Sequence, residues 1–201
     1  MLRLIGFYDY TVILTYLSLC SAVLGMVNSH HGRFTAAVLC VLVSGICDAF
    51  DGMVARTKKN RTEDEKAFGI QLDSLCDVVS FGVCPAYICY TMGVDGIGGV
   101  LHLMLYCVCA VIRLAYFNVL EGKRQQAEGG CNKVYRGLPV TSVSIVLPVV
   151  YILRFFLPEQ LFTRLLFTML VVVAYLFVLD FMVKKPDIAK IMKCSFGKAA
   201  K

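Results

Sequence analysis

Residues 48–56 read Asp-Ala-Phe-Asp-Gly-Met-Val-Ala-Arg, and residues 69–77 read Gly-Ile-Gln-Leu-Asp-Ser-Leu-Cys-Asp. Four aspartates, Asp48, Asp51, Asp73 and Asp77, thereby lie in otherwise apolar sequence. Residues three or four positions apart share one face of a helix, so the members of each pair are expected to point the same way. A carboxylate in or near hydrocarbon is unfavourable unless it is paired or binds a cation. The cluster therefore predicts a site for divalent metal.

The composition of the whole chain is that of a membrane protein. Of its 201 residues, 58% are hydrophobic and 17% are charged, and the mean hydropathy is +0.72; a soluble domain is about half apolar and a quarter charged. A helix of about 20 residues spans the hydrocarbon of a bilayer. Six apolar blocks have about this length: 7–27, 34–54, 69–92, 98–119, 138–157 and 161–183. We predict an all-α polytopic membrane protein with six transmembrane helices, formed by residues 1–201 as a single domain.

The basic residues predict the orientation of these helices. With six spans, the N-terminus, the loops at 55–68 and 120–137 and the basic tail at 184–201 lie on one side of the membrane. These segments hold sixteen of the twenty Lys and Arg residues, and an excess of basic residues marks the cytoplasmic side. We expect both termini and the aspartate-bearing helix ends to face the cytoplasm, in a multi-pass protein of the cell membrane. The tail is either a topology signal or a contact with anionic lipid headgroups.

Other classes of function are disfavoured by the composition. The net charge of +6 does not indicate nucleic-acid binding, because the basic residues flank apolar spans and no module of aromatic and basic residues is present. The ten cysteines do not indicate zinc or disulfides, because the sequence has no C-x-x-C pair and eight of them lie inside apolar spans. We interpret the polar run at 57–66 as a solvated loop, with a lid or a lipid-headgroup contact as the alternative.

Small residues accompany the aspartates along both helices. One face of the second predicted helix carries Gly45, Asp48, Gly52 and Ala55, and one face of the third carries Gly69, Asp73, Asp77 and Ser80. Such residues let membrane helices pack closely and let a ligand reach the backbone. Two aspartate pairs on facing helices could hold two ions about 3.5–4 Å apart, an arrangement that serves displacement at phosphorus. Oxygen ligands favour Mg²⁺ or Mn²⁺ over zinc.

The string D-x-x-D-G-x-x-A-R … G-x-x-x-D-x-x-x-D resembles the signature of the CDP-alcohol phosphatidyltransferase family. All its fixed positions are present, at Asp48, Asp51, Gly52, Ala55, Arg56, Gly69, Asp73 and Asp77. Twelve residues separate Arg56 from Gly69, which is more than the family usually has. Residues 71–86, 112–118 and 137–139 are most similar to bacterial phosphatidylserine synthases, and the resemblance extends over about residues 34–148. Three positions depart from that pattern: Ser18, Tyr116 and Thr141.

The resemblance implies a reaction and a set of residue roles. An alcohol hydroxyl, from L-serine in the serine synthases, attacks the diacylglycerol-bearing phosphorus of CDP-diacylglycerol and releases CMP. Two metal ions, Mg²⁺ or Mn²⁺, would be held by Asp48, Asp51 and Asp73 and by Asp48, Asp73 and Asp77. Asp77 would also be the general base, which a serine hydroxyl needs at neutral pH. The cytidine-diphosphate pocket would be lined by Asp48, Gly52, Ala55, Arg56 and Gly69. A homodimer among membrane lipids is also implied.

Arg113 lies deep in the fourth apolar block. An arginine within a membrane span is by default a functional hypothesis, and its planar fork suits a carboxylate. We predict that Arg113, together with Arg136, binds the carboxylate of L-serine. The alternative is a structural ion pair between Arg113 and one of the aspartates.

Rival functions fall into two classes. Sibling enzymes of the same family would use glycerol-3-phosphate, inositol phosphate or an archaeal ether lipid with serine, and the sequence does not distinguish ester from ether lipids. A transporter of divalent cations or protons is the other class, because intramembrane carboxylates also mark ion paths. Transport sites tend to lie at the midplane between repeated halves. These aspartates lie at helix ends and no repeat is evident, so the enzyme is favoured.

Overall fold

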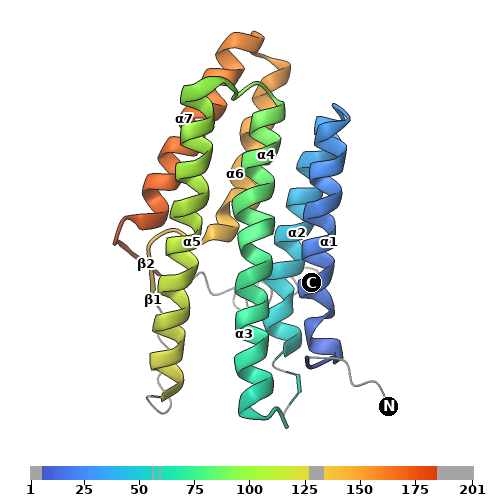
Figure 1. The fold of residues 1–201 in the computed structure, drawn as a ribbon, viewed down its shortest axis with the longest axis vertical. Coiled ribbons are helices and arrows are strands. Elements are labelled where there is room, and N and C mark those ends of the chain that lie inside the picture. Colours follow the sequence, from blue (N-terminus) through green and yellow to red (C-terminus); the bar gives the residue numbers. More distant parts are fainter. Residues whose placement is uncertain (1–5, 56, 59, 127–133, 185–201) are drawn as a thin grey trace, which may run out of the picture.

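The computed structural model describes residues 6–55, 57–58, 60–126 and 134–184, which form an elongated bundle of helices (Figure 1). The helices are α1 (Ile13–His30), α2 (Phe34–Ala55), α3 (Glu63–Asp77), α4 (Cys84–Thr91), α5 (Gly96–Gln126), α6 (Val143–Ile152) and α7 (Glu159–Val178). Short 3-10 segments precede α1 and flank α6: η1 (Tyr10–Val12), η3 (Val140–Ser142) and η4 (Leu153–Phe155). A π-helical segment, η2 (Val78–Val83), joins α3 to α4. The predicted all-α class is confirmed, apart from one short ribbon of two strands.

Five helical stretches of the described part are long and apolar enough to cross a membrane: Tyr10–His30, Phe34–Ala55, Glu63–Thr91, Gly96–Leu120 and Glu159–Val178. The block predicted at 138–157 is a shorter apolar helix, Val140–Phe155. Prolines limit it on both sides, because Pro139 holds extended backbone before its first turn and Pro158 begins the next helix. Six crossings and cytoplasmic termini therefore stay predictions.

Several helix boundaries differ from the prediction; the fourth predicted helix, for example, runs to Gln126 instead of residue 119. Local contacts and backbone geometry explain two of the differences. The third helix begins at Glu63 instead of near residue 69, because Thr62 and Glu65 form a capping box. The Thr62 hydroxyl accepts the Glu65 N–H at 3.2 Å, and Glu65 Oε2 accepts the Thr62 N–H at 3.0 Å. The last helix ends at Val178 and not at residue 183, because Leu179 has extended backbone and leads away from the helix.

A two-stranded ribbon, which the sequence did not predict, joins distant parts of the chain. β1 (Val134–Arg136) pairs antiparallel with β2 (Met182–Lys184), with Tyr135 opposite Val183. Gly137 follows β1 with a φ of +73°, and its N–H donates to the carbonyl of Phe181 at 2.7 Å. The ribbon thus ties the segment that enters α6 to the segment that leaves α7 (Figure 1).

Small and hydroxylated side chains hold α1 against α2. The buried positions of α1 recur every three or four residues and are Thr15, Ser18, Ala22, Gly25 and Ser29. The hydroxyls of Ser18 and Ser44 lie 2.7 Å apart, and each is also within hydrogen-bonding distance of the other residue's carbonyl oxygen. Because lipid offers no competing partners, such small polar contacts support close packing of membrane helices.

Pro85 explains the π-helical segment in the middle of the third span. In a regular α-helix Pro85 could not donate to the carbonyl of Phe81, and its ring would press against that carbonyl. The chain instead widens at η2, where the Cys84 N–H bonds to the carbonyl of Val79. The hydroxyl of Tyr106, on α5, donates to the Phe81 oxygen at 2.6 Å. Tyr106 is fully buried, so this bond gives its hydroxyl a partner and supplies the Phe81 carbonyl with a donor inside the bundle.

Gly45 marks a close approach between α2 and the start of α6. A Cβ atom at this position would lie 2.1 Å from the Ser144 hydroxyl and 2.4 Å from the Ser144 Cβ. The second contact cannot be relieved by rotating the hydroxyl, because a Cβ moves only with its backbone. The two helices would therefore have to separate to accept any larger residue.

We expect Gly45→Ala to lower the stability of the folded bundle by about 1–3 kcal/mol through overpacking. The thermal unfolding midpoint in detergent micelles measures the effect. Gly98→Ala is the matched control, because a Cβ at Gly98 meets no atom within 4 Å and alanine favours helix over glycine. Equal midpoints for Gly45→Ala and the unchanged protein would show that α2 and α6 are not packed this closely.

Candidate active site

Three of the four predicted aspartates converge where α2 and α3 face one another. One carboxylate oxygen from each of Asp48, Asp73 and Asp77 lies within 4.8 Å of the other two. Asp77 is buried, and Asp48 and Asp73 are half-buried. The predicted clustering of aspartates from two helices is confirmed for these three. Their roles as ligands or base are a separate matter and stay predictions.

The fourth aspartate, Asp51, lies beside this group of three. Its Oδ2 atom accepts a hydrogen bond from the Thr15 hydroxyl at 3.1 Å, and it follows Asp48 by three residues on α2. Both Asp51 and Thr15 are buried. Thr15 comes from α1, so three helices build the acidic cluster of Asp48, Asp51, Asp73 and Asp77.

The acidic cluster fits a divalent cation. Carboxylates this close repel one another unless a shared proton or a bound cation lies between them. The Oδ1 atom of Asp73 is buried and has no hydrogen-bond partner among the residues that the structure describes. All donors are carboxylate oxygens, which suit Mg²⁺ or Mn²⁺. An orphaned buried acceptor within a set of hard ligands fits a bound divalent ion.

Neighbouring contacts hold the end of α3. The π-helical segment begins directly after Asp77, so this aspartate lies in the last regular turn. One turn earlier, the Ser74 hydroxyl donates to Asn118 Oδ1 on α5 at 2.8 Å. The end of α3 is therefore tied to α5 through Ser74 before the widened turn and through Phe81 within it.

The predicted nucleotide-binding residues are only partly placed. Gly52 is exposed, and a Cβ there would meet no atom within 4 Å, so space is open beside it. Ala55 is half-buried at the end of α2. Gly69 lies on α3, where the Arg61 side chain covers it. Arg56 lies outside the described residues.

The predicted serine-binding arginines lie near the turn between β1 and α6. Arg113 is buried, with 6% of its surface exposed, and its Nε donates to the carbonyl of Leu138 at 3.1 Å. Arg136 belongs to β1, but its side chain is outside the described part. The contact with Leu138 gives Arg113 a structural role that the sequence did not indicate, and the carboxylate-binding role stays a prediction.

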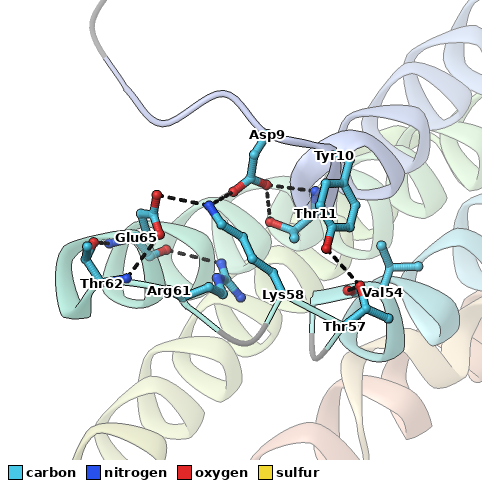
Figure 2. Close-up of polar contacts among 9 residues, drawn as sticks. All are labelled: Asp9, Tyr10, Thr11, Val54, Thr57, Lys58, Arg61, Thr62 and Glu65. Atoms are coloured by element: carbon cyan, nitrogen blue, oxygen red, sulfur yellow. Dashed lines mark hydrogen bonds and ion pairs between the residues drawn. The ribbon is translucent and has the colours of Figure 1, made fainter.

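A polar network at the start of α3 was missed by the sequence analysis, which treated this segment as a solvated loop. Lys58 Nζ lies 2.8 Å from Asp9 Oδ2 and 3.0 Å from Glu65 Oε1, so it joins the N-terminal segment to α3. The Tyr10 hydroxyl lies 3.0 Å from the Thr57 hydroxyl. Figure 2 shows these contacts around the loop that connects α2 and α3. Only the capping box was readable from the sequence.

The Lys58 ammonium changes the acidity of Asp9. Its hydrogen bond, followed by that of the Thr11 hydroxyl, lowers the pKa of Asp9 from an ordinary value of about 3.9 to about 2. The folded protein thus favours the ionised carboxyl. The contribution of Asp9 to stability is present above the unfolded pKa and is lost as the pH falls towards 2.

Comparisons with known proteins agree with this geometry. The sequence model of the CDP-alcohol phosphatidyltransferase family matches residues 10–180. The chain is 34% identical over 155 residues to archaetidylserine synthase of Methanothermobacter thermautotrophicus, covering 77% of this chain and 62% of that protein. It is 38% identical over 116 residues to CDP-diacylglycerol–serine O-phosphatidyltransferase of Saccharomyces cerevisiae, covering 56% and 41%. It is 37% identical over 90 residues to the protein of that name in Bacillus subtilis, covering 44% and 49%.

Each of these matches covers only part of this chain and part of the relative. The chain spans between 41% and 62% of the length of the three curated relatives. No solved structure matches it.

We expect Lys58→Met to raise the pKa of Asp9 towards about 4, because the hydrogen bond that favours the carboxylate is removed. A carboxyl-¹³C NMR titration in micelles measures this value. Lys66→Met is the matched control, because Lys66 pairs with Glu63 and not with Asp9. An Asp9 pKa that stays near 2 without Lys58 would contradict the contact.

Proposed function

The chain belongs to the CDP-alcohol phosphatidyltransferase family, and we propose that it transfers the phosphatidyl group of CDP-diacylglycerol to the hydroxyl of L-serine, giving phosphatidylserine and CMP. The observation that carries this proposal is the convergence of Asp48, Asp73 and Asp77 at facing positions of α2 and α3. The acceptor is supported by the relatives, since all three described above are named for synthesis of a serine lipid or transfer to serine.

The acidic cluster would hold two divalent ions, Mg²⁺ or Mn²⁺. Asp48, Asp51 and Asp73 would bind one, and Asp48, Asp73 and Asp77 the other. When bound, such ions neutralise the charge of the diphosphate and of the transition state. Asp51 is held in place for this purpose by Thr15, and Asp73 brings an acceptor atom that no protein group occupies in the described part.

Asp77 is the proposed base. The serine hydroxyl oxygen forms a bond to the phosphorus that bears diacylglycerol, the bond from that phosphorus to the CMP oxygen breaks, and the hydroxyl proton passes to the carboxylate of Asp77. A carboxylate has two oxygens and about four acceptor positions, so one aspartate can be ligand and base at once. Burial of Asp77 excludes competing water from the group that takes the proton.

The substrates are proposed to meet at the loop-bearing end of the bundle. Gly52, Ala55, Arg56 and Gly69, with Asp48, would line the cytidine-diphosphate pocket, and the open space beside Gly52 supports this. Arg113 and Arg136 would bind the serine carboxylate. The contact of Arg113 with the carbonyl of Leu138 places its guanidinium beside the turn between β1 and α6.

The protein is proposed to cross the cell membrane six times as a homodimer, with both termini and the active site in the cytoplasm. The excess of Lys and Arg in the segments that connect at this end supports the orientation. The ends of α2 and α5 and the start of α3 lie at the same end of the bundle (Figure 1).

A second candidate donor is the ether-linked CDP-archaeol type of lipid with the same serine acceptor. The match to an archaetidylserine synthase, which covers 77% of this chain, favours it. The polar chemistry of the site is the same for both donors, because the lipid chains lie beyond the phosphorus that reacts.

We expect the purified protein to release CMP from CDP-diacylglycerol when L-serine and Mg²⁺ or Mn²⁺ are present, and to stop when the metal is chelated. Glycerol-3-phosphate and inositol phosphate, offered in turn, should not replace serine. Lipid products are identified by mass spectrometry. Release of CMP with another alcohol but not with serine would contradict the acceptor and leave the family reaction standing.

Asp77→Asn is expected to lower kcat by a factor of about 10²–10⁴, the usual contribution of a general base. Binding of CDP should stay measurable, because the other three aspartates remain. Asp180→Asn, at an exposed position after α7, is the control. Turnover of Asp77→Asn at the rate of the unchanged protein would falsify the base assignment.

Arg113→Lys is expected to raise the KM for serine at least tenfold while the KM for CDP-diacylglycerol stays within twofold, because an ammonium cannot form the paired hydrogen bonds of a guanidinium. The unfolding midpoint is measured in parallel, since Arg113 also holds the carbonyl of Leu138. An unchanged KM for serine would leave Arg113 with its structural role alone.

A further inference from the structure

Arg61 lies directly against the backbone of α3. A Cβ atom on Gly69 would be 2.7 Å from Arg61 Nη2 and 3.8 Å from its Cζ. The same Nη2 donates to the carbonyl of Glu65 at 3.2 Å. The guanidinium therefore occupies the space that a side chain at position 69 would fill, and only glycine allows this contact.

Among the described residues of this loop, Arg61 differs from Lys58 and Lys66 in having no anionic partner. Lys58 is paired with Asp9 and Glu65, and Lys66 with Glu63. In the part of the chain that the structure describes, no carboxylate lies within 4.0 Å of the Arg61 nitrogens. Its Nε is buried there without any hydrogen-bond partner. A half-buried guanidinium with a buried, unused donor is suited to bind an anion.

The position of Arg61 relates it to the acidic cluster. Gly69, Asp73 and Asp77 are spaced by four residues, so they lie on one face of α3. With a rise of about 1.5 Å per residue, Gly69 is about 6 Å along the axis from Asp73. The guanidinium thus covers the first position of the face whose later positions carry the carboxylates.

The loop network fixes Arg61 in this place. Lys58 holds the chain before it through Asp9 and Glu65, and the capping box of Thr62 and Glu65 holds the chain after it. Figure 2 shows Arg61 between these two sets of contacts, against the first turns of α3. An arginine that is anchored on both sides is preorganised, which reduces the entropy lost when it binds a ligand.

We propose that Arg61 is a substrate-binding residue, whose guanidinium contacts the phosphate groups of the cytidine-diphosphate headgroup beside Gly69. This inference rests on the proposed function, because it takes the cytidine nucleotide as the ligand of this face. Metal ions at the aspartates and Arg61 one turn away would then neutralise the headgroup from two sides. The loop between α2 and α3 becomes a part of the nucleotide site and not only a connection.

Binding of CDP to the purified full-length protein in the presence of Mn²⁺, measured by isothermal titration calorimetry, tests the proposal. Arg61→Met keeps much of the aliphatic stem and removes the charge. It is expected to raise the Kd for CDP at least tenfold while the KM for serine stays within twofold. Arg61→Lys keeps the charge but not the planar fork of donors, so its Kd for CDP should lie between those of the unchanged protein and Arg61→Met. Lys66→Met removes one charge from the same helix turn and should change the Kd by less than twofold.

Three results would overturn the proposal. An unchanged Kd for CDP in Arg61→Met would remove Arg61 from the nucleotide site and leave the proposed function intact. A raised Kd for Arg61→Met with an equal rise for Lys66→Met would assign Arg61 to packing of the loop. Loss of the folded state in both Arg61 variants would lead to the same assignment. Failure of the unchanged protein to bind any cytidine nucleotide would overturn the proposed function together with this inference.

Discussion

Asp48, Asp73 and Asp77 hold carboxylate oxygens within 4.8 Å of one another between helices that are otherwise apolar. Negative charges at this distance, away from bulk water, repel strongly. Packing between the helices of the bundle must therefore offset that repulsion. The small-residue contact holds α2 against α1, and the close approach at Gly45 holds α2 against the start of α6. A cation in the cluster would change the repulsion into attraction and stabilise the same arrangement.

The third span, formed by α3, η2 and α4, shows how the chain positions Asp73 and Asp77 within the bundle. Its first part, α3, carries Asp73 and Asp77, and its second part, α4, packs as an ordinary apolar helix. The π-helical segment lies between the two parts and shifts the helical phase of one relative to the other. Pro85 creates the need for this wider turn, and the Tyr106 hydroxyl donates to the Phe81 carbonyl within it. A single residue of α5 therefore contacts the segment that directly follows Asp77.

Helical periodicity explains which features could be predicted from the sequence. The spacing of Asp73 and Asp77 was enough to predict that they share one face of a helix. That Asp48 would meet them from another helix was predicted from the cost of unpaired carboxylates in apolar surroundings. The start of α3 was also readable, since Thr62 and Glu65 form a recognisable capping box, but hydropathy placed the boundary too late. The pairing of Lys58 with Asp9 was not readable, because it joins residues 49 positions apart. The β1–β2 ribbon depends on a similar long-range contact.

The contacts of Arg61 also show why the loop was misjudged. In the sequence, its arginine and lysines look alike, and a charge run is usually a solvated surface. In the structure their environments differ: Lys58 is neutralised by two carboxylates, whereas Arg61 lies against glycine backbone. If the carboxylates hold cations as proposed, a diphosphate would also need positive charge on the side away from them. The contact between the loop and α3 places the Arg61 guanidinium one helical turn from the carboxylates, in space that a side chain at position 69 would contest.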